Sequence, residues 1–241
     1  MKQLAFLFLS LILVTSAGAQ KKTYDSLAIR ILDRMSSIIG DMTSCSFTAI
    51  TESNYNDPDL GMLTRIAEHD VMFSGNNKFQ VMTHGERGHL GVWFNAGSMV
   101  YYSYTNNHFG YLDSIGKTNI EAIENANKKF DIEFPAADIF YPTFTDDLIA
   151  TADRIEYLGK SVIGGKECYH IAARGKDLGF QVWINTDATL LPVRMNIIQY
   201  DKQSQQYNVL FKDWKINPNL PDALFAFDPP PDASKMKILP K

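Results

Sequence analysis

The chain has 241 residues, of which 45% are hydrophobic and 21% are charged, and its formal net charge is −4 at pH 7. The charges are spread along the sequence without a basic cluster, which argues against attraction to nucleic acid or to an anionic lipid surface. This length and composition are typical of an ordinary globular domain that holds a substantial core.

Residues 1–19 have the features of a secretory signal peptide. Lys2 gives a basic start, residues 4–14 are almost continuously apolar, and Ala17-Gly18-Ala19 supplies small residues for cleavage. The apolar run is about 11 residues long, whereas a membrane-spanning helix needs about 20. We therefore predict a cleaved signal rather than an anchor helix, and a soluble mature chain, residues 20–241, that forms one domain without a transmembrane segment.

Residues 24–39 have the spacing of an amphipathic helix. Its apolar positions recur at intervals of three and four residues, and they are Leu27, Ala28, Ile31, Met35, Ile38 and Ile39. Gly40 follows them and is well placed to end the helix in a left-handed cap.

The pattern then changes to short β-favouring runs separated by turn residues, which predicts an antiparallel meander. The expected strands are residues 47–51, 68–73, 78–83, 91–94, 99–104 and 108–112. Two cysteines, Cys45 and Cys168, would enter an oxidising compartment on export. Both a disulfide and two buried free thiols fit the sequence, because connectivity cannot be deduced from it.

A helical insertion and a second series of strands follow. Residues 119–130 have helical spacing with Thr118 as a cap, and shorter helical pieces are expected at 135–139 and 146–151. The second series of strands comprises residues 155–162, 168–173, 179–185, 191–200 and 207–214. A proline-rich tail closes the chain, and its Leu224, Phe225 and Phe227 are expected to pin it to a sheet edge.

An antiparallel sheet with this many strands must curl or close, because strand twist accumulates. We therefore predict an α+β fold in which a strongly curved antiparallel sheet, an open half-barrel, has helices covering its concave face.

The segment from Tyr157 to Pro230 holds several short motifs that form a recognisable pattern. They are Tyr157-Leu158-Gly159-Lys160, Gly164-Gly165-Lys166-Glu167-Cys168-Tyr169-His170, Gln181-Val182-Trp183-Ile184, Leu191-Pro192-Val193-Arg194, Lys212-Asp213-Trp214 and Leu220-Pro221-Asp222-Ala223-Leu224-Phe225. This pattern resembles a family of uncharacterised predicted periplasmic proteins, domain of unknown function 2092. That family looks related to the LolA-like superfamily of lipoprotein carriers, so the resemblance implies a LolA/LppX-like half-barrel, a periplasmic location and a container for a hydrophobic ligand.

Alternation along the strands assigns an inward face, and Trp183 is expected to point outward, opposite Phe180 and Val182. The inward residues that we predict to line a ligand cavity are Phe79, Val81, Val100, Tyr102, Phe180, Val182, Ile184, Met195 and Ile197. The alternative is that the same rows form an ordinary packed core beneath the helices.

The sequence lacks the common catalytic motifs, including phosphate-binding glycine loops, the Gly-x-Ser-x-Gly elbow and the zinc-protease helix. His84 and His89 flank one turn, but a metal site needs three or four ligands. Cys168 and His170 share a strand face, without a nameable orienting group or oxyanion site. We therefore predict no catalytic residue, no metal, no cofactor and no enzymatic activity.

These observations favour an exported periplasmic binding or carrier protein for a hydrophobic small molecule, a lipid or a lipidated protein. An envelope sensor or protein-interaction module that uses the same curved sheet is the alternative, with Trp183 as the residue to watch and an envelope protein as partner. An exported hydrolase is a lesser alternative. Nucleic acid is not an expected partner.

Overall fold

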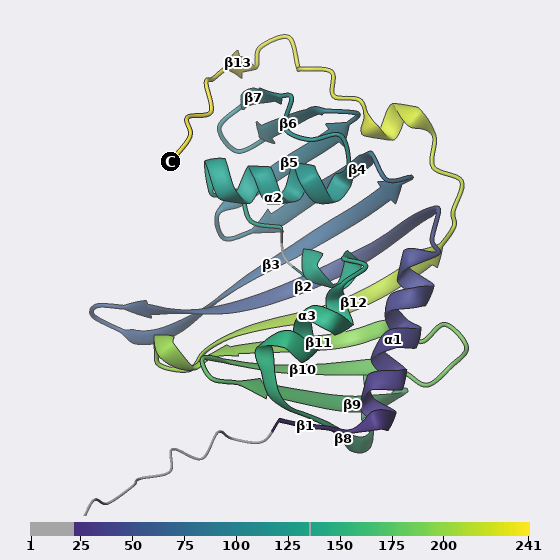
Figure 1. Cartoon of the computed structure of the whole chain (residues 1–241). Coiled ribbons are helices and arrows are strands. Elements are labelled where there is room, and N and C mark those ends of the chain that lie inside the picture. The colour runs from purple at the N-terminus through teal and green to yellow at the C-terminus, as the bar shows by residue number, and fades with distance from the viewer. Residues whose placement is uncertain (1–21, 135) are drawn as a thin grey trace, which may run out of the picture.

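The computed structural model describes residues 22–134 and 136–241 (Figure 1). The predicted signal peptide, residues 1–19, lies outside the described residues. The strands are β1 (Thr23–Tyr24), β2 (Ser44–Asp57), β3 (Gly61–Ser74), β4 (Lys78–Gly85), β5 (Gly88–Asn95), β6 (Ser98–Ser103), β7 (His108–Asp113), β8 (Ala152–Ile163), β9 (Lys166–Gly175), β10 (Leu178–Asn185), β11 (Pro192–Gln199), β12 (Gln205–Ile216) and β13 (Ser234–Lys235). The helices are α1 (Ser26–Gly40), α2 (Asn119–Phe130) and α3 (Phe144–Thr151), with short 3₁₀ turns η1 (Ala137–Phe140), η2 (Tyr200–Lys202) and η3 (Asp222–Phe225).

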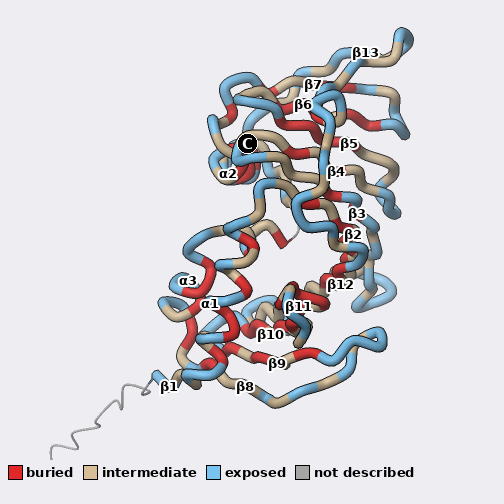
Figure 2. The backbone as a smooth tube through the Cα atoms, turned by 90° about the vertical axis from the view of Figure 1, so that its right-hand side faces the viewer, coloured by how far each residue is buried: buried red, intermediate tan, exposed pale blue. Residues whose placement is uncertain are grey.

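All strands of the described part of the chain belong to one sheet, in the order β1-β8-β9-β10-β11-β12-β2-β3-β4-β5-β6-β7-β13. Two antiparallel meanders, β2–β7 and β8–β12, are joined where β12 pairs antiparallel with β2. The sheet curves strongly, and buried residues run along the side that faces the helices (Figure 2). The predicted curved antiparallel sheet with helices on its concave face is confirmed.

Helices α1 and α3 lie over the β8–β12 meander (Figure 1). The Asp25 carboxylate caps α1 by accepting the backbone N–H of Leu27 at 2.7 Å. The predicted left-handed cap at Gly40 is wrong. The helix ends at Gly40, and the next residue, Asp41, keeps right-handed backbone angles with φ −81°. The backbone N–H of Asp41 donates to the carbonyls of Ser37 and Ile39, so the helix ends without a left-handed residue.

Helix α2 lies over the other meander, near β4 to β7 (Figure 1). The Thr118 hydroxyl accepts the backbone N–H of Glu121 at 3.2 Å, and the Glu121 carboxylate accepts the N–H of Lys117 at 2.7 Å. This reciprocal capping confirms Thr118 as the helix cap. The Asn119 backbone N–H bonds the carbonyl of Asn76 at 2.6 Å, so that the β3–β4 turn holds the start of α2 against the sheet.

Strands β2 and β3 are longer than predicted, and they form a hairpin that projects beyond the rest of the sheet (Figure 1). Their pairing continues to Asp57 opposite Gly61. Residues 52–57 are polar or turn-forming, so the sequence suggested a loop where the backbone pairing persists.

The tail covers a sheet edge as predicted, but it does so through β13, whereas Phe227, which was expected to pin it to that edge, packs on a face of the sheet. Its Phe227 ring packs against Trp93, Tyr102 and Phe109, with ring centres 4.9, 5.3 and 5.8 Å apart. Strand β13 then pairs in parallel with β7, and Ile238 reaches the concave side. The open edge of the sheet, which invites pairing with other chains, is thereby covered.

Cys45 and Cys168 are both buried and free. The structure therefore has two free thiols and no disulfide between them. Burial raises the pKa of the Cys45 thiol to about 12, which makes it unreactive at neutral pH. Among the described residues, no helix combines the length and apolarity that a membrane span requires.

Candidate ligand site on the concave face

The concave face of the β2–β7 meander keeps a groove of about 880 Å³. Strands β2 to β6 form its floor, and residues 131–134 and the tail form its walls. Its apolar lining comprises Ile66, Ala67, Val81, Leu90, Val92, Tyr101, Ile132, Phe134, Met236 and Ile238. Charged residues also contribute, namely Arg65, Glu86, Arg87, Asp131 and Glu133. Its size and mixed lining are within the range of ligand sites in proteins.

A second, more polar lobe of about 730 Å³ continues from this groove between α2 and β12. Four residues line both spaces, and they are Ser53, Glu133, Phe134 and Tyr207. The two lobes therefore meet at Tyr207 on the sheet side and at residues 133–134 on the opposite side.

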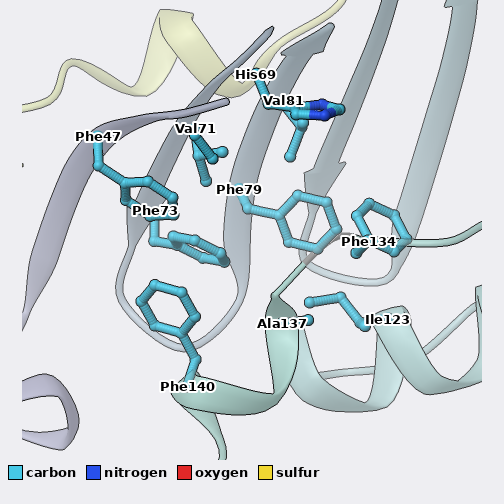
Figure 3. Close-up of a pocket in the computed structure, with 11 residues that line it drawn as sticks. Phe47, His69, Val71, Phe73, Phe79, Val81, Ile123, Phe134, Ala137 and Phe140 are labelled. Atoms are coloured by element: carbon cyan, nitrogen blue, oxygen red, sulfur yellow. The ribbon is translucent and has the colours of Figure 1, made fainter. Parts of the chain in front are cut away.

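Deeper in the fold, a small aromatic cavity of about 30 Å³ adjoins the groove (Figure 3). Rings from the sheet and from the insertion meet there, with Phe73 and Phe140 centred 5.0 Å apart and Phe79 and Phe134 5.4 Å apart. This volume holds about one water-sized probe, so the aromatic cavity is essentially closed. A larger occupant requires displacement of η1, which carries Phe140.

A row of polar side chains lies between the aromatic cavity and the groove. The imidazole of His69 lines both spaces, and its Nε2 and Nδ1 are 3.0 Å and 2.9 Å from the hydroxyls of Thr51 and Thr83. Burial lowers the pKa of His69 to about 4, against the smaller opposing effect of Asp70. The ring is therefore neutral at physiological pH, and this polar row carries no charge.

The sequence-predicted cavity residues fall into three groups. Phe79 lines the aromatic cavity, Val81 lines both that cavity and the groove, and Ile197 lines the polar lobe. The structure therefore brings these three residues to one continuous concave site.

A second group is packed under α1 and α3 instead. Phe180, Val182, Ile184 and Met195 are all buried in the main core, and the Phe180 ring meets Phe144 of α3 edge-on at 5.7 Å. Their inward orientation is as predicted. Their role in ligand binding stays a prediction, because helices occupy the space that a ligand would need.

The prediction that Val100 and Tyr102 face inward is wrong. They belong to a separate cluster with Trp93 and Phe109, on the face that the tail covers through Phe227. Met99 and Tyr101 take the inward positions of β6. Both faces of β6 are apolar because both are covered. Alternation along the strand therefore does not reveal which face points towards the concave side.

The sequence analysis missed the polar row. His69 is buried, whereas its neighbours Glu68 and Asp70 on β3 are exposed, so His69 alone of the three turns inward. Thr51 and Thr83 lie beside it because both positions continue an otherwise apolar inward row, at spacing two from Ala49 and Val81. A polar residue that interrupts such a row is the signal that could have identified them.

The histidines considered for chemistry have structural partners. The rings of His84 and His89 stack at 3.9 Å, and His89 also stacks on Tyr104 at 4.0 Å. In the described residues, no group of three or more His, Cys, Asp or Glu side chains is arranged to hold a metal ion. His170 bonds Gln181 at 3.0 Å and stacks on Trp183 at 4.3 Å.

The family model of predicted periplasmic proteins, domain of unknown function 2092, matches residues 28–239. The chain belongs to this family, as the sequence pattern indicated. No curated protein matches the chain in sequence.

Solved structures of similar fold share little sequence with this chain. An uncharacterised conserved protein from Thermus thermophilus is 13% identical, with a TM-score of 0.48, over 88% of this chain and 99% of that one. The lipoprotein LppX from Mycobacterium tuberculosis is 12% identical, with a TM-score of 0.48, over 82% of this chain and 100% of that one. A LolA superfamily protein from Nitrosomonas europaea is 12% identical, with a TM-score of 0.39, over 83% of this chain and 97% of that one.

Proposed function

We propose that this protein is an exported, periplasmic, non-catalytic binding or carrier protein for a hydrophobic ligand such as a lipid or a lipidated polypeptide. The observation that carries the proposal is the groove of about 880 Å³ on the concave face of the β2–β7 meander. Its apolar lining would be costly to expose to water without an occupant, at roughly 25 cal/mol for each Å². The periplasmic location follows the description of the family.

The groove is bordered by Arg65 and Ile66 of the projecting β2–β3 hairpin, by residues 131–134 and by the tail. The wall residues 131–134 begin at Asp131, which is left-handed with φ 59°, and precede Ala136, which is also left-handed with φ 59°. Both are non-glycine residues in a sparsely populated conformation. Residues 131–134 are therefore the part of the wall that we expect to shift when a ligand enters.

Ala67→Trp tests the groove directly. Ala67 lies on its floor and is only partly buried, so an indole would fill the groove without forcing the core apart. Fluorescence titration with the apolar dye N-phenyl-1-naphthylamine should show binding to the wild type. The variant should bind about tenfold more weakly, the factor that a loss of about 1.4 kcal/mol produces.

The matched control is Ala172→Trp, the same substitution on the opposite face of the sheet. Ala172 is partly buried in β9 and alternates with the core residues Ile171 and Ala173. The control should retain wild-type dye binding. Equal loss in both variants, or no dye binding by the wild type, would refute a ligand site in the groove.

The alternative of a protein-interaction module receives less support from the outward face. Trp183 does point outward as predicted, but its ring is held between His170 at 4.3 Å and the Arg194 guanidinium at 5.8 Å. A ring already stacked within the sheet offers less free surface to a partner.

A further inference from the structure

One polar atom on the concave face stands apart from its surroundings. The hydroxyl of Tyr207 is buried and has no hydrogen-bond partner in the part of the chain that the structure describes. A buried hydroxyl without a partner costs free energy, so each such group needs an explanation. Tyr207 lines both lobes of the concave site, at the point where they meet.

The neighbours of this hydroxyl are the polar row of Thr51, His69 and Thr83. Val209 of β12 pairs with Thr51 of β2. Tyr207 lies two residues from Val209 along β12, so it is the diagonal neighbour of Thr51 on the same face of the sheet. Burial raises the pKa of the Tyr207 hydroxyl most, and the nearby Glu133 carboxylate raises it further. A weak side-chain interaction with Thr51, outside normal hydrogen-bond geometry, lowers it. The polar row thus extends over four adjacent strands, β12, β2, β3 and β4.

The surroundings of the row are apolar on its inner side. Ala49, Val71 and Val81 are the next inward residues, and the aromatic cavity lies beyond them (Figure 3). On its outer side the row faces the wide groove. Because the aromatic cavity is essentially closed, the row presents its polar groups to the groove, where the polar end of an amphiphile can bind them while its alkyl chain follows the apolar lining.

Hydrogen-bond accounting shows what the row can offer. A neutral imidazole has one N–H and one free nitrogen, so one threonine hydroxyl must donate to His69 and the other must accept from it. The Thr51 hydroxyl donates to the Ala67 carbonyl at 3.4 Å, so Thr51 accepts from His69 and Thr83 donates to it. The free O–H group of Tyr207 is the donor that remains. The row therefore needs an acceptor, and it has no positive charge with which to compensate a carboxylate or a phosphate.

We propose that Tyr207, together with Thr51, His69 and Thr83, forms a binding site for an uncharged hydrogen-bond acceptor on the ligand, an ester carbonyl or a hydroxyl, with the adjoining alkyl chain in the groove. This inference rests on the proposed function and specifies its ligand class. A neutral lipid with a polar group at the end of a long alkyl chain meets these requirements.

The substitution Tyr207→Phe removes the hydroxyl and keeps the ring. The probes are methyl palmitate, 1-hexadecanol and hexadecane, each used to displace N-phenyl-1-naphthylamine from the protein. We expect Tyr207→Phe to weaken methyl palmitate and 1-hexadecanol by about five- to tenfold, the worth of one buried hydrogen bond, and to leave hexadecane unchanged. The variant should melt no lower than the wild type, because an unpaired buried hydroxyl has been removed.

The matched control is Tyr157→Phe, the same substitution on β8. Tyr157 is partly buried in the other meander and lines neither lobe of the concave site. This variant should bind all three probes as the wild type does. Infrared spectroscopy of carbonyl-labelled methyl palmitate gives an independent readout, since a hydrogen bond moves the ester band to lower wavenumber. The shift should be present in the wild type and in Tyr157→Phe, and reduced in Tyr207→Phe.

An equal effect of Tyr207→Phe on all three probes, or no effect on any, would overturn this inference while leaving a general hydrophobic site intact. Stronger binding of palmitate than of methyl palmitate by the wild type would also overturn it, because the row would then prefer an anion. Failure of every probe, including the dye, to bind the wild type would instead refute the proposed function.

Discussion

The concave faces of the two meanders differ in how completely helices fill the space above them. Under α1, the β8–β12 meander packs residues such as Val182 and Ile184 with no exposed surface, whereas the β2–β7 meander retains a groove of about 880 Å³. Helix α1 has 15 residues and inserts Leu32 and Met35 fully into the core, while α2 has 12 residues and presents the small side chains Ala122 and Ala126.

The comparison shows that alternation along a strand defines a face but not what covers it. Both meanders turn apolar residues inward, and the length and side chains of the covering helix decide whether that face becomes core or cavity. Substitutions at equivalent depth in the two meanders should therefore have unequal effects.

Val182→Trp should show the largest difference. Val182 is 0% exposed beneath the helices, so an indole has no space and should destabilise the protein by about 3 kcal/mol or more. Ala67→Trp in the groove should change the free energy of unfolding little. Chemical denaturation of both variants checks the contrast, and a well-folded Val182→Trp protein would mean that the β8–β12 meander also holds a cavity.

The second prediction concerns pH and the β2–β7 meander alone. The pKa of His69 is about 4 when folded, against an ordinary value of about 6.5 when unfolded, so the unfolded chain binds the proton more readily. Stability is therefore complete above pH 6.5 and falls as the pH falls towards 4. We expect a loss of about 2 kcal/mol between pH 7 and pH 5 from this residue.

Urea denaturation across that pH range measures the slope. His69→Gln should flatten it, whatever its effect on absolute stability, and His84→Gln at the exposed end of β4 should not. A slope that persists in His69→Gln would assign the pH dependence to other groups.

The third prediction concerns the tail behind the groove. Phe227 anchors it to Trp93, Tyr102 and Phe109, and Phe227→Ala should cost about 1–2 kcal/mol, less than a fully buried phenylalanine because the side chain is partly exposed. Hydrogen exchange should then increase at the β7 edge and leave β8–β12 unaffected. Equal exchange throughout the sheet would contradict a local role for the tail.

The smallest expected effect is at the start of α2. Thr118→Ala removes the hydroxyl that caps the Glu121 N–H and should lower stability by about 1 kcal/mol. Thr143, at the equivalent position of α3, makes no such cap bond, so Thr143→Ala should cost less. Thermal melting compares the two, and equal losses would show that the cap contributes nothing to α2.

The sequence predicted the fold well because the strands have regular spacing and clear turns. Every strand of the two meanders and the position of α2 were expected, and the inward orientation of Phe180 and Val182 was expected as well. The projecting part of the β2–β3 hairpin was not, because its polar residues carry no burial signal.

The candidate site was harder to predict, because its walls come from distant parts of the chain. Phe134, Ile238 and Tyr207 line one groove but belong to a loop, the tail and β12. Val100 and Tyr102 were misplaced because the tail makes their outer face apolar too. Which residues border a cavity depends on how helices and tail lie over the sheet, and local periodicity does not contain that information.

The junction of the two meanders has a consequence for the time course of folding. Strand β12 pairs with β2, so that Tyr207 lies opposite Ser53, and contacts between such distant segments close late because they cost the most chain entropy. Each meander can form from local hairpins as the chain folds, but Tyr207 joins Thr51 and His69 only when β12 has arrived. We therefore expect the proposed binding site to be assembled last, and a chain that stalls before residue 205 to expose the unpaired edge of β2 with half of that site already in place.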